Sequence, residues 1–174
     1  DNNIYVTYLP DEDMSKVINT SKKLSDEGYQ VIPHLPARTI ESYKMLEEYI
    51  KKLSEECGCT KILVIGGGGK QKGEIKSSIE VLNTDLLSKY KFKEVGLAGH
   101  PEGNPDVKQA DLDDAIIQKN EFSKNADFKM YLATQFFFES TSLEQWEKHL
   151  NKLNNKLEIH AGIPGPATLK TLLS

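Results

Sequence analysis

The strongest constraint on the fold is an alternation that repeats six times along the chain. Each time, a short run of apolar or β-branched residues is followed by a longer stretch with apolar residues at helical spacing. This alternation is typical of βα units, whose strands pair into a parallel sheet. The strands are therefore expected at residues 4–8, 30–34, 61–65, 94–98, 130–136 and 157–161.

The stretches between the strands predict six amphipathic helices. The first begins in an acidic cap region and stops at Gly28, and the last carries Pro166 in its first turn. The expected helices cover residues 11–27, 39–56, 74–90, 111–123, 142–153 and 166–173. No linker or low-complexity tract separates the units, so we expect one domain over residues 1–174.

Composition and charge argue against binding to nucleic acids or membranes. The net charge is −4, and lysines and glutamates are interleaved rather than gathered into a basic stripe. Nucleic acids and anionic membranes need such a stripe, and no apolar run reaches the roughly 18 residues that span a bilayer. We therefore expect neither partner. The only cysteines, Cys57 and Cys59, fit a reduced thiol pair in a cytoplasmic protein.

Residues suited to ligand contact follow nearly every predicted strand. A TIM barrel spreads such residues around its mouth, whereas an open doubly wound sheet concentrates them at one switch point. The sequence therefore predicts an α/β fold of the (β/α)8 TIM barrel type, with six βα units in this chain. The residues concerned are Thr7 and Tyr8, His34, residues 66–69, residues 100–102, Thr134 and Gln135, and His160 and Gly162.

Two of these groups leave alternatives open. Four glycines followed by Lys70 can bring backbone N–H groups close to an anion, but the loop lacks the Walker pattern and could be a flexible turn. His34, His100 and His160 each end a strand, and three histidines could hold zinc for a hydrolase. With no HxH pair and no strand-ending aspartate, we favour histidines that orient a ligand by hydrogen bonding, and no metal.

Gln135 precedes three phenylalanines in a row, at positions 136–138. An amide can read the edge of a planar heterocycle while an aromatic ring stacks on its face. Taken individually, each phenylalanine is better explained by packing in the barrel or a helix. The motif therefore indicates a flat ligand, with Gln135 as its best-supported contact.

Taken in chain order, these strand-end motifs resemble those of the methylenetetrahydrofolate reductases. The similarity covers nearly the whole chain, and its most specific parts are the TQFFF motif and the PEGNP loop. The matching motifs are Val6-Thr7-Tyr8, Pro33-His34-Leu35, Ile62-Leu63-Val64-Ile65-Gly66-Gly67, Ala98-Gly99-His100-Pro101-Glu102-Gly103-Asn104-Pro105, Thr134-Gln135-Phe136-Phe137-Phe138 and Gly162-Ile163-Pro164.

The resemblance implies a TIM-barrel oxidoreductase of one-carbon metabolism, which holds FAD and uses NAD(P)H to reduce 5,10-methylenetetrahydrofolate to 5-methyltetrahydrofolate. It implies that Gln135 holds the pterin and that Phe137 or a neighbour stacks on it. The implied FAD contacts are Thr7, His34, Gly66, Gly67, Gly68, Ala98 and His100.

The resemblance also implies that the six units are the second to seventh of eight. The family's general acid, a glutamate on the first strand, is then expected upstream of Asp1, and a homo-oligomer is left open. Three positions depart from the family pattern: Gly68 stands where the family has a flavin-tuning aspartate, His100 where it has a tyrosine, and Asn104 where it often has a histidine. A folate-binding, reductase-like protein without flavin is therefore the first alternative, and the histidine-based metal hydrolase is the second.

Overall fold

Six parallel strands form one sheet whose spatial order follows the chain. The computed structural model describes residues 2–9, 12–67, 71–105, 107–137 and 139–163. Every neighbouring pair of strands is parallel, as the alternation predicted. The strands are β1 (Asn3–Val6), β2 (Gln30–Pro36), β3 (Lys61–Ile65), β4 (Glu94–Gly99), β5 (Lys129–Phe136) and β6 (Glu158–Gly162).

Helical segments connect each strand to the next. Side chains at their amino ends cap several of them: Asp13 accepts a hydrogen bond from the backbone N–H of Ser15 at 2.7 Å, and Ser42 accepts one from Met45 at 3.2 Å. The predicted helix at 166–173 lies outside the described residues. The helices are α1 (Met14–Asp26), the 3₁₀ turn η1 (Ala37–Thr39), α2 (Tyr43–Lys51), its π-helical continuation η2 (Lys52–Glu56), α3 (Ser78–Leu82), α4 (Leu86–Lys89), α5 (Gln109–Ser123) and α6 (Ser140–Lys152).

The prediction of one helix over residues 74–90 was wrong. The segment folds as two short helices, α3 and α4, because the chain turns at Thr84 and Asp85. Asp85 has a left-handed backbone, with φ of 57°, and the Thr84 hydroxyl donates to the carbonyl of Val81 at 2.6 Å. Short polar side chains compete with helical hydrogen bonding in this way.

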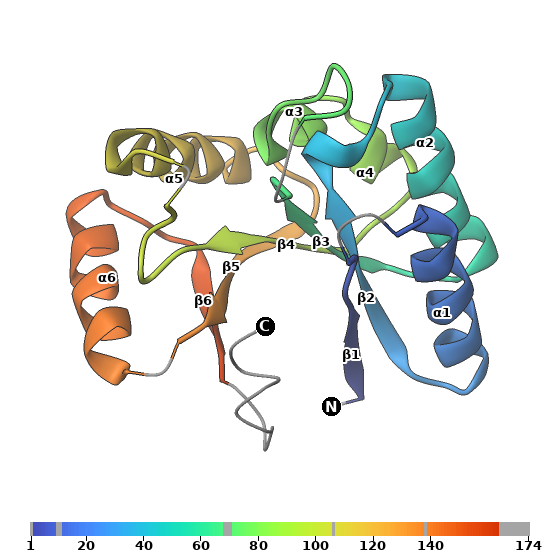
Figure 1. Ribbon diagram of the computed structural model, residues 1–174, viewed down its shortest axis with the longest axis horizontal. Helices are drawn as coiled ribbons and strands as arrows, with labels where there is room; N and C mark the ends of the chain where they lie inside the picture. Colours follow the sequence, from blue (N-terminus) through green and yellow to red (C-terminus); the bar gives the residue numbers. More distant parts are fainter. Residues whose placement is uncertain (1, 10–11, 68–70, 106, 138, 164–174) are drawn as a thin grey trace.

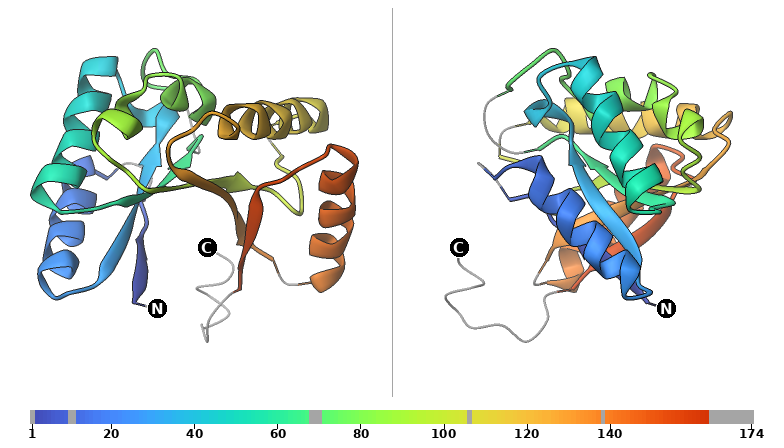
Figure 2. Two further views of the ribbon diagram at one scale, coloured as in Figure 1. Left: turned by 180° about the vertical axis from the view of Figure 1, so that it is seen from behind. Right: turned by 90° about the vertical axis from the view of Figure 1, so that its right-hand side faces the viewer.

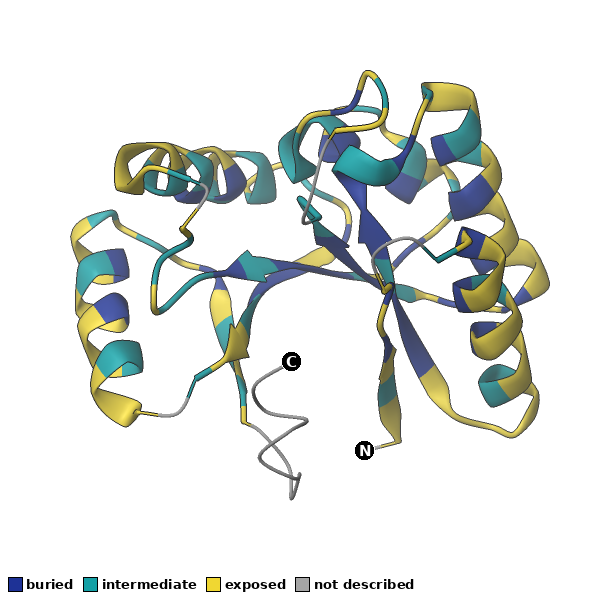
Figure 3. Cartoon of the chain, viewed as in Figure 1, coloured by how far each residue is buried: buried dark blue, intermediate teal, exposed yellow. Residues whose placement is uncertain are grey.

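The helices all lie on the outer side of the curled sheet, and its inner side is concave (Figure 1, Figure 2). Such a curled parallel sheet with alternating helices fits part of a (β/α)8 barrel. The main core fills the layer between sheet and helices (Figure 3). The strand residues of this core include Val31, Leu35, Ile62, Val64, Val95, Leu97 and Leu132. None of the described helices is both long and apolar enough to cross a bilayer.

Tyr5 and Tyr131 show how strongly the sheet curls. Their hydroxyl oxygens lie 3.0 Å apart, although β1 and β5 are four strands apart in the sheet. In a flat sheet these strands would be about 19 Å apart at the usual spacing. The two side chains therefore meet across the concave face. Between them, a Cβ added to Gly96 would lie 2.7 Å from the Tyr131 ring and 2.8 Å from Leu63.

Candidate ligand site at the carboxyl ends of the strands

His34 lies on the concave face near the carboxyl end of β2. Its ring meets the edge of the Tyr5 ring, with centroids 6.4 Å apart and planes at 76°. Its Nδ1 is buried and has no hydrogen-bond partner among the described residues. Burial lowers the pKa of His34 to about 4, so the imidazole is neutral at pH 7. A buried nitrogen without a partner is costly, and a bound ligand could supply that partner.

Gly66 and Gly67 continue from β3 and lie against the turn that follows β2. The backbone N–H of Arg38 donates to the Gly66 carbonyl at 2.9 Å, which ties the loop to η1. Gly67 has φ of +86°, and a Cβ there would lie 3.2 Å from the Cβ of Pro36. This position therefore favours glycine, both for its backbone angle and for the close approach. Gly68 lies outside the described residues, as do Gly69 and Lys70.

Ala98 lies near the carboxyl end of β4 and His100 directly follows that strand, and a buried lysine supports Ala98 from the helix side of the sheet. Lys119 of α5 is only 5% exposed and donates from Nζ to the Ala98 carbonyl at 2.9 Å. Burial lowers the pKa of Lys119 to about 8. Burial also lowers the pKa of His100, and the charge of Lys119 lowers it further. His100 therefore favours the neutral form and can both donate and accept hydrogen bonds.

The residues after β1 face different environments. Thr7 is exposed, while Tyr8 is buried and packs in the core beneath the helices. Of these two, only Thr7 is open to a ligand.

Gln135, Phe136 and Phe137 lie at the carboxyl end of β5, and Phe138 lies outside the described residues. Gln135 is exposed, Phe136 is 66% exposed, and Phe137 is partly buried. The pairing of β5 with β6 is irregular here, with a register shift between Ala133 and Phe136. The predicted substrate contact Gln135 therefore sits within a β-bulge, a feature that often redirects side chains near active sites.

His160 lies deeper on the concave face than the end of β5. Its ring stacks on Tyr131 at 4.1 Å, with the planes at 23°, and its Nε2 is 3.4 Å from a Glu158 carboxylate oxygen. His34, by contrast, contacts Tyr5. Within the described ranges, no three His, Cys, Asp or Glu side chains are grouped so that they could hold a metal ion. The metal-hydrolase alternative gains no support from this arrangement.

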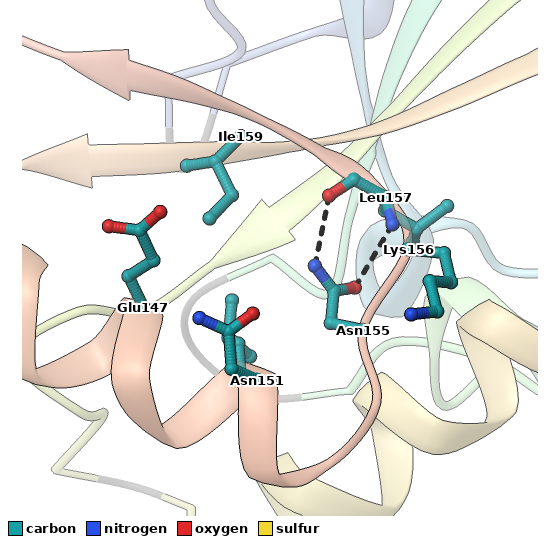
Figure 4. Close-up of a pocket in the computed structure, with 7 residues that line it drawn as sticks. Glu147, Asn151, Asn155, Lys156, Leu157 and Ile159 are labelled. Atoms are coloured by element: carbon teal, nitrogen blue, oxygen red, sulfur yellow. Dashed lines mark hydrogen bonds between the residues drawn. The ribbon is translucent and has the colours of Figure 1, made fainter.

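A hollow at the other end of β6 is unrelated to these residues. It is lined by Glu147, Leu150 and Asn151 of α6 and by the start of β6 (Figure 4). The Asn155 side chain already donates to the Leu157 carbonyl at 2.9 Å and accepts from the Leu157 N–H at 3.3 Å. The amide therefore shapes the turn into β6 and is not free for a ligand.

Sequence analysis did not identify Lys119, Tyr5 or Tyr131. The signal for Lys119 was present: it follows Ile116 by three positions, so it occupies the apolar stripe of α5.

The sequence was also compared with models of known protein families. A family model described as methylenetetrahydrofolate reductase matches residues 3–172, nearly the whole chain.

Proposed function

Because this chain belongs to the methylenetetrahydrofolate reductase family, we propose that it contributes to the reduction of 5,10-methylenetetrahydrofolate to 5-methyltetrahydrofolate by NAD(P)H, with FAD held at the strand ends. The family match over residues 3–172 carries the proposal. It is supported by polar and glycine residues at the carboxyl ends of successive strands, where TIM-barrel enzymes build their active sites.

The described residues fit a flat cofactor with hydrogen-bonding edges. The buried Nδ1 of His34 needs a partner, and Gly67 exposes backbone where a side chain would meet Pro36. We assign Thr7, His34, Gly66 and Gly67 to FAD, together with Ala98 of β4, His100 directly after β4, and Gly68, which follows Gly67 in the sequence. When bound, FAD would supply the two-electron chemistry that links NAD(P)H to the folate.

Lys119 has a supporting role in this proposal. It donates to the carbonyl of Ala98, whereas the side chain of Ala98 shares the concave face with Gly96, because Val95 and Leu97 of β4 face the core on the helix side. Gln135 is exposed and can donate to and accept from the edge of the pterin, while Phe137 or a neighbouring phenylalanine offers a stacking surface.

We further propose that residues 1–174 form one domain, comprising the second to seventh units of the eight-unit barrel. Strands β1 and β6 are the edges of the described sheet, and closing the barrel requires further strands to pair with them. The family's general acid would lie on the first strand of that barrel.

Substitution of Gln135 tests the folate assignment. Gln135→Ala in the full-length protein is expected to weaken binding of 5-methyltetrahydrofolate by about 1 to 3 kcal/mol, the usual cost of leaving a polar group of the bound ligand without its hydrogen-bond partner. Gln118→Ala, which removes an exposed amide from α5, is the matched control and should leave the affinity unchanged. Equal affinities for wild type and Gln135→Ala, measured by titration calorimetry, would remove Gln135 from the site.

The absorbance of the purified full-length protein separates the alternatives. A visible flavin absorbance band is expected for an FAD enzyme. A colourless protein that still binds 5-methyltetrahydrofolate would instead support the flavin-independent alternative. Stoichiometric zinc would support the hydrolase.

A further inference from the structure

The bulge in β5 changes which residue of that strand pairs with Gly162 of β6. Ala133 pairs with His160, so a regular ladder would pair Gln135 with Gly162 two positions later. The observed partner of Gly162 is Phe136. One extra residue in β5 has therefore moved Phe136 into the place that Gln135 would otherwise occupy.

The face on which Phe136 lies follows from its neighbours. His160 is on the concave side, because its ring stacks on Tyr131, whose hydroxyl meets Tyr5 across that face. Gly162 is two residues further along β6 and shares the face of His160. Paired residues of parallel strands project to the same side, so Phe136 also lies on the concave face.

Two contacts fix the bulge in this register. The Thr134 hydroxyl oxygen accepts a hydrogen bond from the Gly162 N–H at 2.7 Å. A Cβ on Gly162 would lie 2.8 Å from the Thr134 carbonyl oxygen, so a larger residue would displace the bulge. The position of Phe136 is therefore set by Thr134 and Gly162 together.

We propose that Phe136, rather than Phe137, provides the stacking surface for the planar ring of the substrate. Phe136 combines the concave face with a side chain that is 66% exposed, whereas Phe137 is partly buried. An aromatic side chain left this exposed keeps apolar surface in contact with water, and a flat ligand that covers this surface would be stabilised by its burial. Phe136 also adjoins the amide of Gln135, so one segment supplies both a face and an edge contact.

This inference rests on the proposed function, because it takes the pterin of a folate as the ring. The probe is 5-methyltetrahydrofolate, titrated calorimetrically into the full-length protein. Phe136→Leu keeps an apolar side chain but removes the aromatic face, and Phe137→Leu is the matched control. Because stacking of a flat ring on an aromatic side chain stabilises its binding, Phe136→Leu should weaken binding by roughly fivefold to a hundredfold.

Phe137→Leu and the conservative Phe136→Tyr should each bind within about twofold of wild type, because both keep an aromatic ring at position 136. Wild-type affinity in Phe136→Leu, or a loss in Phe137→Leu as large as that in Phe136→Leu, would overturn the assignment. If the inference alone fails, Gln135→Ala still weakens binding while Phe136→Leu does not. A wild-type protein that binds no 5-methyltetrahydrofolate would overturn the proposed function and this inference together.

Discussion

Lys119 makes the stability of this protein depend on pH in the alkaline range. Its pKa is lowered by burial from 10.5 to about 8. Between these values the unfolded chain binds more protons at this site than the folded chain, so stability should rise with pH. At about 1.4 kcal/mol per pKa unit, the full rise is about 3 kcal/mol, and about 2.5 kcal/mol of it is reached by pH 10.

Lys119→Met removes this titration and leaves the Ala98 carbonyl without its partner. The free energy of unfolding is measured by urea denaturation at several pH values from 7 to 10, for wild type and variant. The difference between the two, wild type minus Lys119→Met, should grow by about 2.5 kcal/mol across that range. Other groups that titrate there contribute equally to both proteins. Lys148→Met, which removes an exposed lysine of α6, should give a nearly constant difference. A constant difference for Lys119→Met as well would refute the buried-cation account.

Two further predictions concern the concave face. Burial lowers the pKa of His34 from 6.5 to about 4, so between these pH values the unfolded chain binds more protons at this site than the folded chain. The free energy of unfolding of the wild type should therefore fall by about 2 to 3 kcal/mol as the pH drops from 6.5 to 4. This fall should be smaller in His34→Gln. If the free energy of unfolding of His34→Gln fell between pH 6.5 and pH 4 by as much as that of the wild type, this account would be contradicted. Gly96→Ala should lower the free energy of unfolding, measured by urea denaturation, by about 1 to 3 kcal/mol, because the added Cβ would overlap Tyr131 and Leu63. Gly66→Ala is the control: the space around its Cβ is open, so its free energy of unfolding should stay within about 1 kcal/mol of the wild-type value.

The βα alternation could be predicted because it is recorded in local sequence periods. All six strands occur where apolar runs predicted them, and four of the helices are shifted by only a few residues. The break between α3 and α4 was missed because apolar spacing continues from Ile79 to Leu86 across it. It depends on a left-handed residue, Asp85, and on a hydroxyl contact from Thr84, neither of which changes the hydrophobic period.

The residues at the strand ends could be predicted individually, but which of them pair or meet across the sheet could not. Sequence analysis placed Gln135 and the phenylalanines at one strand end, yet the bulge that pairs Phe136, instead of Gln135, with Gly162 leaves no local trace in the sequence. It depends on a contact between Thr134 and Gly162, which are 28 positions apart in the chain. The Tyr5–Tyr131 hydroxyl pair likewise requires the curl of the whole sheet.

The charge states of the strand-end histidines bear on which part of a cofactor they could meet. Burial favours the neutral form of both His34 and His100. A neutral imidazole is a poor counter-ion for a phosphate, but it hydrogen-bonds well to the polar edge of an uncharged ring. Under the proposed function, His34 and His100 therefore belong beside the ring system. The phosphates of the cofactor would need other partners, such as backbone N–H groups of a glycine loop or a lysine that remains charged at neutral pH.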